Sequence, residues 1–182
     1  TSTDWALFIS SAATASLSGS SGNIWSSSTG SNSIIANNGT GNLASGDFSF
    51  AAGKTNESSG SYSTIVGGQL SNAISAYTFI GNGVNHSASG PASFIGNGYV
   101  NRTTGAASFV GAGSNNKAGE SYSFIGAGAG NTATTKYSFI GAGSQNLVSG
   151  NSYSTNYSAS VVVGGKQNKA LDGYNYSSSF VG

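Results

Sequence analysis

The residues of this chain that could act as acids or bases are few and widely spaced. Its five carboxylates, at Asp4, Asp47, Glu57, Glu120 and Asp172, lie at least ten residues from one another. Glycoside hydrolysis commonly uses two carboxyl groups held about 5–10 Å apart. Stacking of repeats or association of chains could bring such a pair together, but solvated charges are the expected state. We therefore expect no catalytic residue and no enzyme.

Metal and cofactor chemistry has equally little support. His86 is the only histidine, and the chain has no cysteine. A metal site would need three chains to meet at an axis, or help from carboxylates. The surrounding Asn85-His86-Ser87 is typical of an exposed corner. The recurring Gly-x-Gly steps fail as a dinucleotide fingerprint because no helix follows them, so we expect neither a metal nor a cofactor.

Composition argues against two further classes of function, nucleic-acid binding and membrane insertion. Only 6% of the 182 residues are charged, the net charge is +1, and the six basic residues are scattered. Nucleic-acid binding depends on clustered Lys and Arg, so it is not expected. No apolar run approaches the roughly 18 residues of a membrane span, so membrane insertion is not expected either.

The dominant signal is a repeat of about fifteen residues. A Ser-Phe-Ile/Val-Gly motif recurs at fifteen-residue intervals from residue 93 to 141, with upstream copies at Thr78-Phe79-Ile80-Gly81 and Ile65-Val66-Gly67. A fixed period indicates repeat architecture. Each unit continues with Gly and Asn, which tolerate tight reversals. The sequence therefore predicts an all-β parallel β-solenoid, or β-roll, in which each coil is strand, corner, strand, corner.

Adjacent bulky residues in each motif predict association. Neighbouring side chains of a strand point to opposite faces, so Phe124 and Ile125 must face opposite ways. Because a narrow coil has only one interior, the other face needs a partner, and a side-by-side homotrimer is the simplest solution. The expected core and interface residues are Phe79, Ile80, Phe94, Ile95, Phe109, Val110, Phe124, Ile125, Phe139, Ile140, Val162 and Val163.

Tyrosines fall into two groups. Tyr62, Tyr77, Tyr122 and Tyr137 recur two positions before a strand residue whose face they should share, which predicts a stacked ladder. The motif then arrives late at Val162-Val163-Gly164 and Phe180-Val181-Gly182, by eight and three extra residues. The inserted loops carry Tyr153, Tyr157, Tyr174 and Tyr176. Loops on a rigid scaffold often carry recognition, so these four are candidate receptor contacts, with packing between chains or loop filler as the alternatives.

The chain divides into an irregular N-terminal part and the repeats. Residues 1–32 are expected to form a cap or a joint to an upstream segment, and residues 33–182 the solenoid. The chain starts without Met and stops within a motif. We interpret it as a fragment of a longer polypeptide.

The repeat resembles known surface fibres. The unit Tyr122-Ser123-Phe124-Ile125-Gly126-Ala127-Gly128, followed by Asn131-Thr132-Ala133, is similar to the head repeats of trimeric autotransporter adhesins. It looks closer still to repeats in tail-fibre proteins of tailed phages, because Phe stands where the adhesin heads have a small residue. The resemblance covers residues 33–182 and implies a trimeric left-handed β-roll used for attachment.

The expected function is that of a structural and adhesive fibre segment. It would be extracellular, on a virion, and contact itself and a glycan or protein of the host surface. A bacterial trimeric surface adhesin, displayed on the cell surface, is the alternative. A polysaccharide depolymerase and an ice-binding solenoid are less favoured, the latter because few Thr residues are in register.

Overall fold

A computed structural model describes residues 25–36, 41–150, 159–172 and 179–182. Throughout these residues the chain is built from short strands and corners, with no helix. Within the same ranges there is accordingly no apolar helix of a length that would cross a membrane. The solenoid class predicted from the repeat is confirmed.

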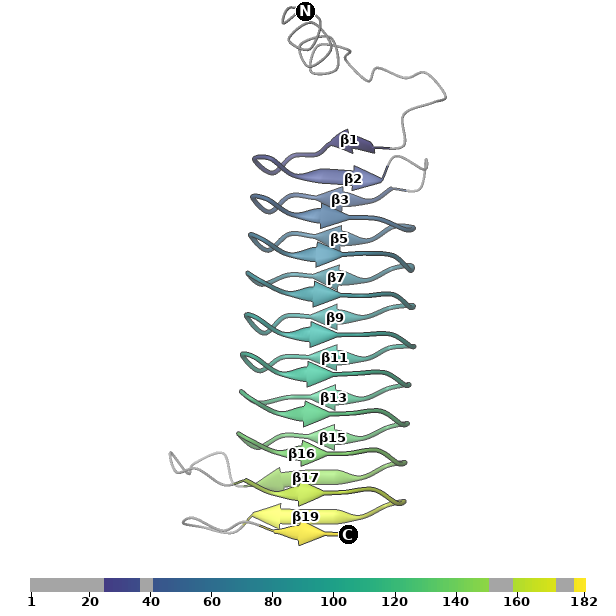
Figure 1. Cartoon of the computed structure of the whole chain (residues 1–182), viewed down its shortest axis with the longest axis vertical. Coiled ribbons are helices and arrows are strands. Elements are labelled where there is room, and N and C mark those ends of the chain that lie inside the picture. The colour runs from purple at the N-terminus through teal and green to yellow at the C-terminus, as the bar shows by residue number, and fades with distance from the viewer. Residues whose placement is uncertain (1–24, 37–40, 151–158, 173–178) are drawn as a thin grey trace, which may run out of the picture.

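The strands form two sheets that alternate along the chain (Figure 1). The strands of the first sheet are β1 (Trp25–Ser27), β2 (Ile34–Ala36), β4 (Phe50–Ala51), β6 (Thr64–Ile65), β8 (Phe79–Ile80), β10 (Phe94–Ile95), β12 (Phe109–Val110), β14 (Phe124–Ile125), β16 (Phe139–Ile140), β18 (Val161–Val162) and β20 (Phe180–Val181). The strands of the second sheet are β3 (Leu43–Ala44), β5 (Glu57–Ser58), β7 (Asn72–Ala73), β9 (Ser87–Ala88), β11 (Arg102–Thr103), β13 (Lys117–Ala118), β15 (Thr132–Ala133), β17 (Leu147–Gly150) and β19 (Lys169–Asp172).

Each turn of the chain adds one strand to each sheet, so equivalent residues stack in columns. Phe94 pairs with Phe79 above it and Phe109 below it, and Ser87 pairs with Arg102, all in parallel. The nine-strand sheet corresponds to about nine turns, or rungs. Only β1 runs antiparallel, folding back on β2 at the N-terminal end of the described stack. The period therefore translates directly into straight columns of like residues.

The core is a thin line of side chains between the two sheets. From the first sheet come Ile65, Ile80, Ile95, Ile125 and Ile140, together with Val110 and Val162, all fully buried. The second sheet contributes mostly alanine, because only a small side chain fits opposite isoleucine in so narrow a coil. Each buried Ile or Val stabilises the fold by about 1.5–3 kcal/mol.

Serines and glycines explain the rest of the motif. The buried hydroxyl of Ser108 donates to the carbonyl of Gly105 at 2.7 Å, and Ser138 donates likewise to Thr135 at 2.7 Å. The glycine after each Phe-Ile pair lies against the next rung: a Cβ on Gly111 would collide with the backbone oxygen of Gly126. The serine hydroxyl thus supplies a hydrogen bond to the carbonyl three residues before it, and the glycine allows the backbones of neighbouring rungs to come close together.

The predicted register is wrong by one residue in two rungs. Val161 and Val162 pair with Phe139 and Ile140, so Val163 takes the place of Gly141 and is 49% exposed. The expected core position of Val163 is therefore corrected. Likewise Thr64 and Ile65, rather than Ile65 and Val66, pair with Phe79 and Ile80. In both rungs a run of β-branched residues hides which member points inward.

Candidate interaction surface

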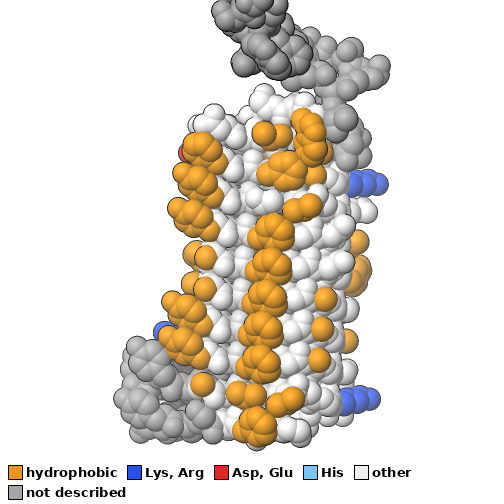
Figure 2. All heavy atoms as spheres, viewed as in Figure 1, with side chains coloured by type: hydrophobic (Ala, Val, Ile, Leu, Met, Phe, Trp, Pro, Cys, Tyr) orange, Lys and Arg blue, Asp and Glu red, His pale blue; other side chains and the backbone are white. Residues whose placement is uncertain are grey.

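The outer faces of the two sheets differ in chemistry. The outward residues of the second sheet between β5 and β15 are polar or charged, namely Glu57, Asn72, Ser87, Arg102, Lys117 and Thr132. The outward residues of the first sheet over the same rungs are Thr64 followed by five phenylalanines. Figure 2 shows these rings as a continuous central stripe of hydrophobic side chains. Over these rungs the outward strand residues are therefore mainly apolar on the first sheet and polar on the second, although Ile74, directly after β7, is 50% exposed.

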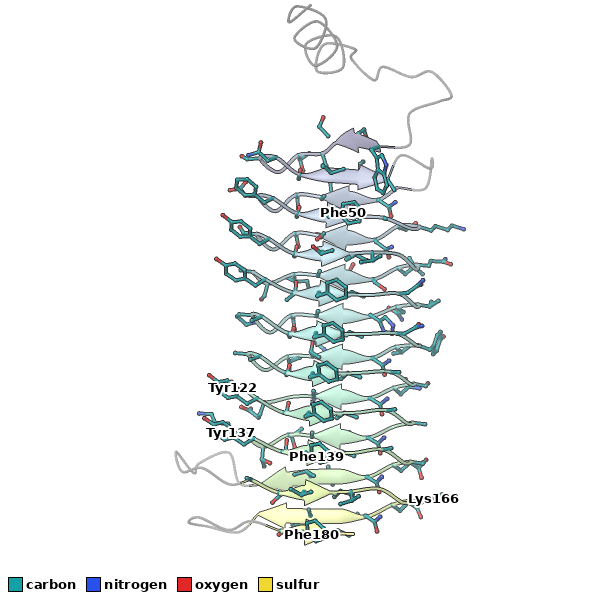
Figure 3. All side chains as sticks on the ribbon, viewed as in Figure 1. Phe50, Tyr122, Tyr137, Phe139, Lys166 and Phe180 are labelled. Atoms are coloured by element: carbon teal, nitrogen blue, oxygen red, sulfur yellow. The ribbon has the colours of Figure 1, made fainter. Side chains whose placement is uncertain are left out.

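The Phe column, defined as Phe79, Phe94, Phe109, Phe124 and Phe139, is a regular stack (Figure 3). The centroids of successive rings lie 5.1, 4.8, 4.7 and 5.0 Å apart, and neighbouring rings are within 7° of parallel. Stacking of this kind contributes about 0.5–1.5 kcal/mol per pair beyond area burial. The column stiffens the rod along its axis.

The rings of Phe94, Phe109, Phe124 and Phe139 also lie over the glycine two residues later, on the same face of the strand. Cε1 of Phe109 is 3.2 Å from where a Cβ of Gly111 would stand, and Cε1 of Phe94 is 3.4 Å from that of Gly96. The ring covers backbone that glycine leaves bare. This pairing accounts for the recurrence of Phe and Gly at fixed spacing.

The column extends toward both ends with less regular residues. At the N-terminal end Trp25 packs on Phe50 with ring centroids 5.3 Å apart and planes at 42°. At the C-terminal end Val161 precedes Phe180, which is 73% exposed.

Within one chain, the phenylalanines and isoleucines face opposite ways. The isoleucines are fully buried, whereas the Phe rings are only partly covered, by their neighbours in the column, and Phe139 is 38% exposed. That sister chains cover the remaining Phe surface stays a prediction.

A second aromatic stack, the aromatic corner, consists of Phe48, Tyr62, Tyr77, Tyr122 and Tyr137. Phe48, Tyr62 and Tyr77 stack at 5.1 and 5.2 Å, and Tyr122 stacks on Tyr137 at 5.0 Å. All five have φ between 54° and 60°. They therefore sit at a corner in left-handed conformation, and the expectation that the tyrosines share a strand face with the Phe column is corrected.

A buried polar column is the feature that sequence reasoning missed. Asn56, Asn101, Asn116, Asn131 and Asn146 point inward and are at most 1% exposed. Asn116 Nδ2 donates to the carbonyls of Ala112 at 3.1 Å and Gly128 at 2.8 Å, while its Oδ1 accepts from the amide of Asn131 at 3.0 Å. The sequence analysis expects the recurring Asn at tight reversals, but the residue with the left-handed conformation is the one before the buried Asn, such as Asn115 with a φ of 55°. The fifteen-residue register of the inner Asn was the available signal.

His86 occupies this same column and is 1% exposed, so the prediction of an exposed corner is wrong. Its Nε2 lies 3.1 Å from the Asn82 carbonyl, and its Nδ1 accepts from the Asn101 amide at 3.1 Å. Burial lowers the pKa of His86, against the opposing effect of the Asn82 carbonyl. The ring is thus a neutral substitute for asparagine, with Nε2 as the donor.

The carboxylates with described side chains lie on the surface. Asp47 and Glu120 are exposed at the same corner but about five rungs apart, which is about 24 Å along the axis. Glu57 lies on the outer face of the second sheet. Among the described residues, no three His, Cys, Asp or Glu side chains converge on a possible metal site.

The candidate receptor contacts Tyr153, Tyr157, Tyr174 and Tyr176 lie outside the described residues. The strands that lead to them are described: β17 and β19 are four residues long and pair from Leu147 with Lys169 to Gly150 with Asp172. The corresponding coils hold seven and four residues more than fifteen, since Phe139 pairs with Val161 and Val161 with Phe180. Both insertions therefore follow the C-terminal ends of two neighbouring strands of the second sheet, β17 and β19.

No protein-family model and no curated protein sequence matches this chain. The functional argument accordingly rests on the surface of the solenoid itself.

Proposed function

We propose that this chain is a structural and adhesive segment of a surface fibre, in which three copies associate side by side through their Phe columns. The fibre is extracellular and of the phage tail-fibre type. It holds binding elements at a distance from the particle that carries it. The observation that carries this proposal is that, from β5 to β16, the outward strand residues of the first sheet are mostly phenylalanine and those of the second sheet are polar or charged.

The Phe column supports association because it is long, flat and apolar. Contiguous exposed apolar patches of this kind commonly mark interaction sites. Fully burying a Phe side chain contributes about 1.5–3 kcal/mol, and here part of that gain remains for a partner to supply. Because five rings are stacked in line, a partner that covers the column would obtain this free energy of burial at each of five rungs.

Parallel, in-register copies fit the regular spacing of the column. The rings of every copy recur at 4.7–5.1 Å, so three columns around one axis match at every rung at once. Cyclic symmetry closes such an assembly. The polar outer faces of the second sheets then remain in water, which agrees with their Arg, Lys, Asn and Ser residues.

Light scattering tests the assembly. The wild-type chain should give three times the 17.9 kDa of one chain. Replacing Phe94, Phe109 and Phe124 together by Thr should leave single chains of unchanged circular dichroism, because Thr64 already occupies this column. Wild-type chains that stay single at every concentration would contradict the proposal, and a twofold mass would contradict the threefold arrangement.

A matched control uses the polar face. Arg102→Thr together with Lys117→Thr makes the same kind of change in two rungs on the outer side of the second sheet, where Thr132 is already accommodated. The particle mass should not change. A loss of mass in this control would show that association does not depend on the Phe column.

The adhesive part is tested separately at the insertions. Tyr153→Ala with Tyr157→Ala, and Tyr174→Ala with Tyr176→Ala, should reduce binding of the fibre segment to bacterial host cells by flow cytometry while leaving its mass unchanged. Tyr99→Ala, at an exposed tyrosine elsewhere, is the control. Equal binding by all variants would exclude these tyrosines as receptor contacts.

A further inference from the structure

Two positively charged side chains are neighbours on the outer face of the second sheet. Arg102 of β11 pairs directly with Lys117 of β13 in parallel register, so the two side chains leave the sheet one rung apart, about 4.8 Å. Both are exposed. Like charges directly opposite one another destabilise a sheet. Their juxtaposition is therefore unfavourable for the chain alone, although only 6% of its residues are charged.

Neither cation is neutralised within the described part of the chain. There, neither side chain makes a hydrogen bond or an ion pair. Glu57 stands in the same column but three rungs from Arg102, about 14 Å along the axis. Glu120 lies at the aromatic corner, where Lys136 occupies the following rung. The pair therefore presents two positive charges to a partner outside the chain.

A gap in the neighbouring outer column brings Lys117 close to two threonines. This column consists of the residues directly after β11, β13 and β15, namely Thr104, Gly119 and Thr134. Cε of Lys117 lies 3.7 Å, and Cγ2 of Thr134 3.1 Å, from where a Cβ of Gly119 would stand. The aliphatic stem of Lys117 thus lies across the position that glycine leaves empty. Its ammonium group is thereby brought beside the threonine column.

The threonine hydroxyls in this column are arranged as acceptors. Thr104 Oγ1 donates to the carbonyl of Gly119 at 2.8 Å, and Thr134 Oγ1 donates to that of Val148 at 3.2 Å. Because each proton is used within the fold, each oxygen is left to accept a hydrogen bond from outside. The face therefore offers cations to negative groups and acceptor oxygens to hydroxyl groups.

We propose that this face binds an acidic polysaccharide, with a carboxylate or sulfate group between Arg102 and Lys117 and sugar hydroxyls donating to Thr104 and Thr134. A guanidinium group can hold such an anion through two parallel hydrogen bonds, and the ammonium group adds a second charge one rung away. A sugar chain also supplies the hydroxyl donors that the threonine oxygens can accept.

A protein partner fits this face less well. From β9 to β15 the outward residues, in the two columns described, include no Leu, Ile, Val, Met or aromatic side chain. Interfaces between proteins have a hydrophobic core. A polymer of charged and hydroxylated units matches the polar character of these rungs better.

The face stays open in the proposed fibre, because the trimer is formed through the other sheet. The inference names a ligand class for the adhesive role and in that sense rests on the proposed function. Single contacts of this kind are weak, but an acidic polysaccharide repeats its charge and a fibre repeats the site in each copy. Such multivalency raises the overall affinity without any new contact.

Binding of the chain to immobilised polysaccharides tests the site. The probes are polygalacturonate, which carries carboxylates, dextran sulfate, which carries sulfates, and neutral dextran. The chain should bind at least one acidic polymer, more weakly as salt is added, and should not bind neutral dextran. Arg102→Thr with Lys117→Thr should weaken this binding by at least about fivefold. Absence of binding to both acidic polymers, or equal binding to neutral dextran, would overturn the proposal.

A matched control removes the same charge from another part of the surface. Lys54→Ser with Lys166→Ser takes two positive charges from an exposed corner column in which Ser114 and Ser144 already occur (Figure 3). Both double variants change the net charge from +1 by two units, to −1. The control should bind the acidic polymer as the wild type does. An equal loss in both double variants would show attraction by net charge alone and overturn the proposal.

Methyl signals locate the contact. Titration with oligogalacturonate or a sulfated oligosaccharide, whichever polymer type binds, should shift the signals of Thr104, Thr132 and Thr134 but not that of Thr64 on the first sheet. Shifts that leave the first three threonines unchanged would overturn the proposal. So would tighter binding of double-stranded DNA than of either acidic polysaccharide, because it would indicate a site for phosphodiesters. Light scattering on the same samples reports assembly, so failure of this site and failure of the proposed trimer are seen separately.

Discussion

Replacing Asn116 by alanine removes one member of the buried asparagine column without touching the apolar core. Among the described residues, the backbone N–H of Asn131 and the carbonyl of Ala112 have no hydrogen-bond partner other than Asn116, so both lose theirs. The side-chain Nδ2 of Asn131 loses one acceptor but keeps the carbonyls of Ala127 and Gly143. The Gly128 carbonyl loses one donor but keeps the Ser114 amide at 2.9 Å. An unsatisfied buried group costs about 1–3 kcal/mol. We expect a loss of about 2–5 kcal/mol in the free energy of unfolding.

The neighbouring asparagine is a matched control. Asn115 is exposed and has a φ of 55°, a conformation that glycine adopts readily. Asn115→Gly should therefore change the free energy of unfolding by no more than about 0.5 kcal/mol. Two adjacent asparagines are thus expected to differ several-fold in their contribution to the free energy of unfolding.

Urea unfolding followed by far-ultraviolet circular dichroism measures the difference. All variants are compared at one protein concentration, because association adds to apparent stability. Hydrogen exchange then locates the loss of amide protection, which should be largest in the rungs of Asn116 and Asn131. The reasoning is refuted if Asn116→Ala unfolds within about 1 kcal/mol of Asn115→Gly.

Three further predictions concern single rungs. Ile125→Ala should lower the free energy of unfolding by about 2–5 kcal/mol in the same urea assay, because a fully buried side chain leaves a cavity; a loss below about 1 kcal/mol would contradict this. Gly111→Ala should lower the melting temperature because its Cβ would strike the next rung, whereas Gly164→Ala, with open space around it, should not; equal effects would refute the close-approach argument. Because burial lowers the pKa of His86, the unfolded chain binds more protons below about pH 6.5, so stability should fall on acidification by up to about 1.4 kcal/mol per pH unit. His86→Asn should flatten this dependence, and an unchanged pH profile would show that His86 is not its source.

The repeat predicts most of the fold because its period and its glycines leave few alternatives. Alternation along a strand places Phe124 outward and Ile125 inward, as the structure shows. The register of the late rung was harder to predict, because Val161, Val162 and Val163 are interchangeable by type. Residues around them carry the missing signal, since Ser160 and Asn168 align with inner residues of the preceding coil.

The polar column shows why residue type alone misleads. Asparagine suits both left-handed corners and buried hydrogen-bonding positions, so Asn115 and Asn116 look equivalent in sequence. Only the fifteen-residue spacing from Asn101 to Asn116 and Asn131 marks the inner one. His86 lies in the same register, fifteen residues before Asn101, which could have placed it in the interior.

Hydroxyl-radical footprinting over a concentration series tests most directly whether the Phe column is an interface. As chains assemble, oxidation of Phe94, Phe109 and Phe124 should fall, while that of Tyr99, at 55% exposure, should stay constant. Oxidation of the three phenylalanines that does not change as the particle grows would contradict burial of the column between chains.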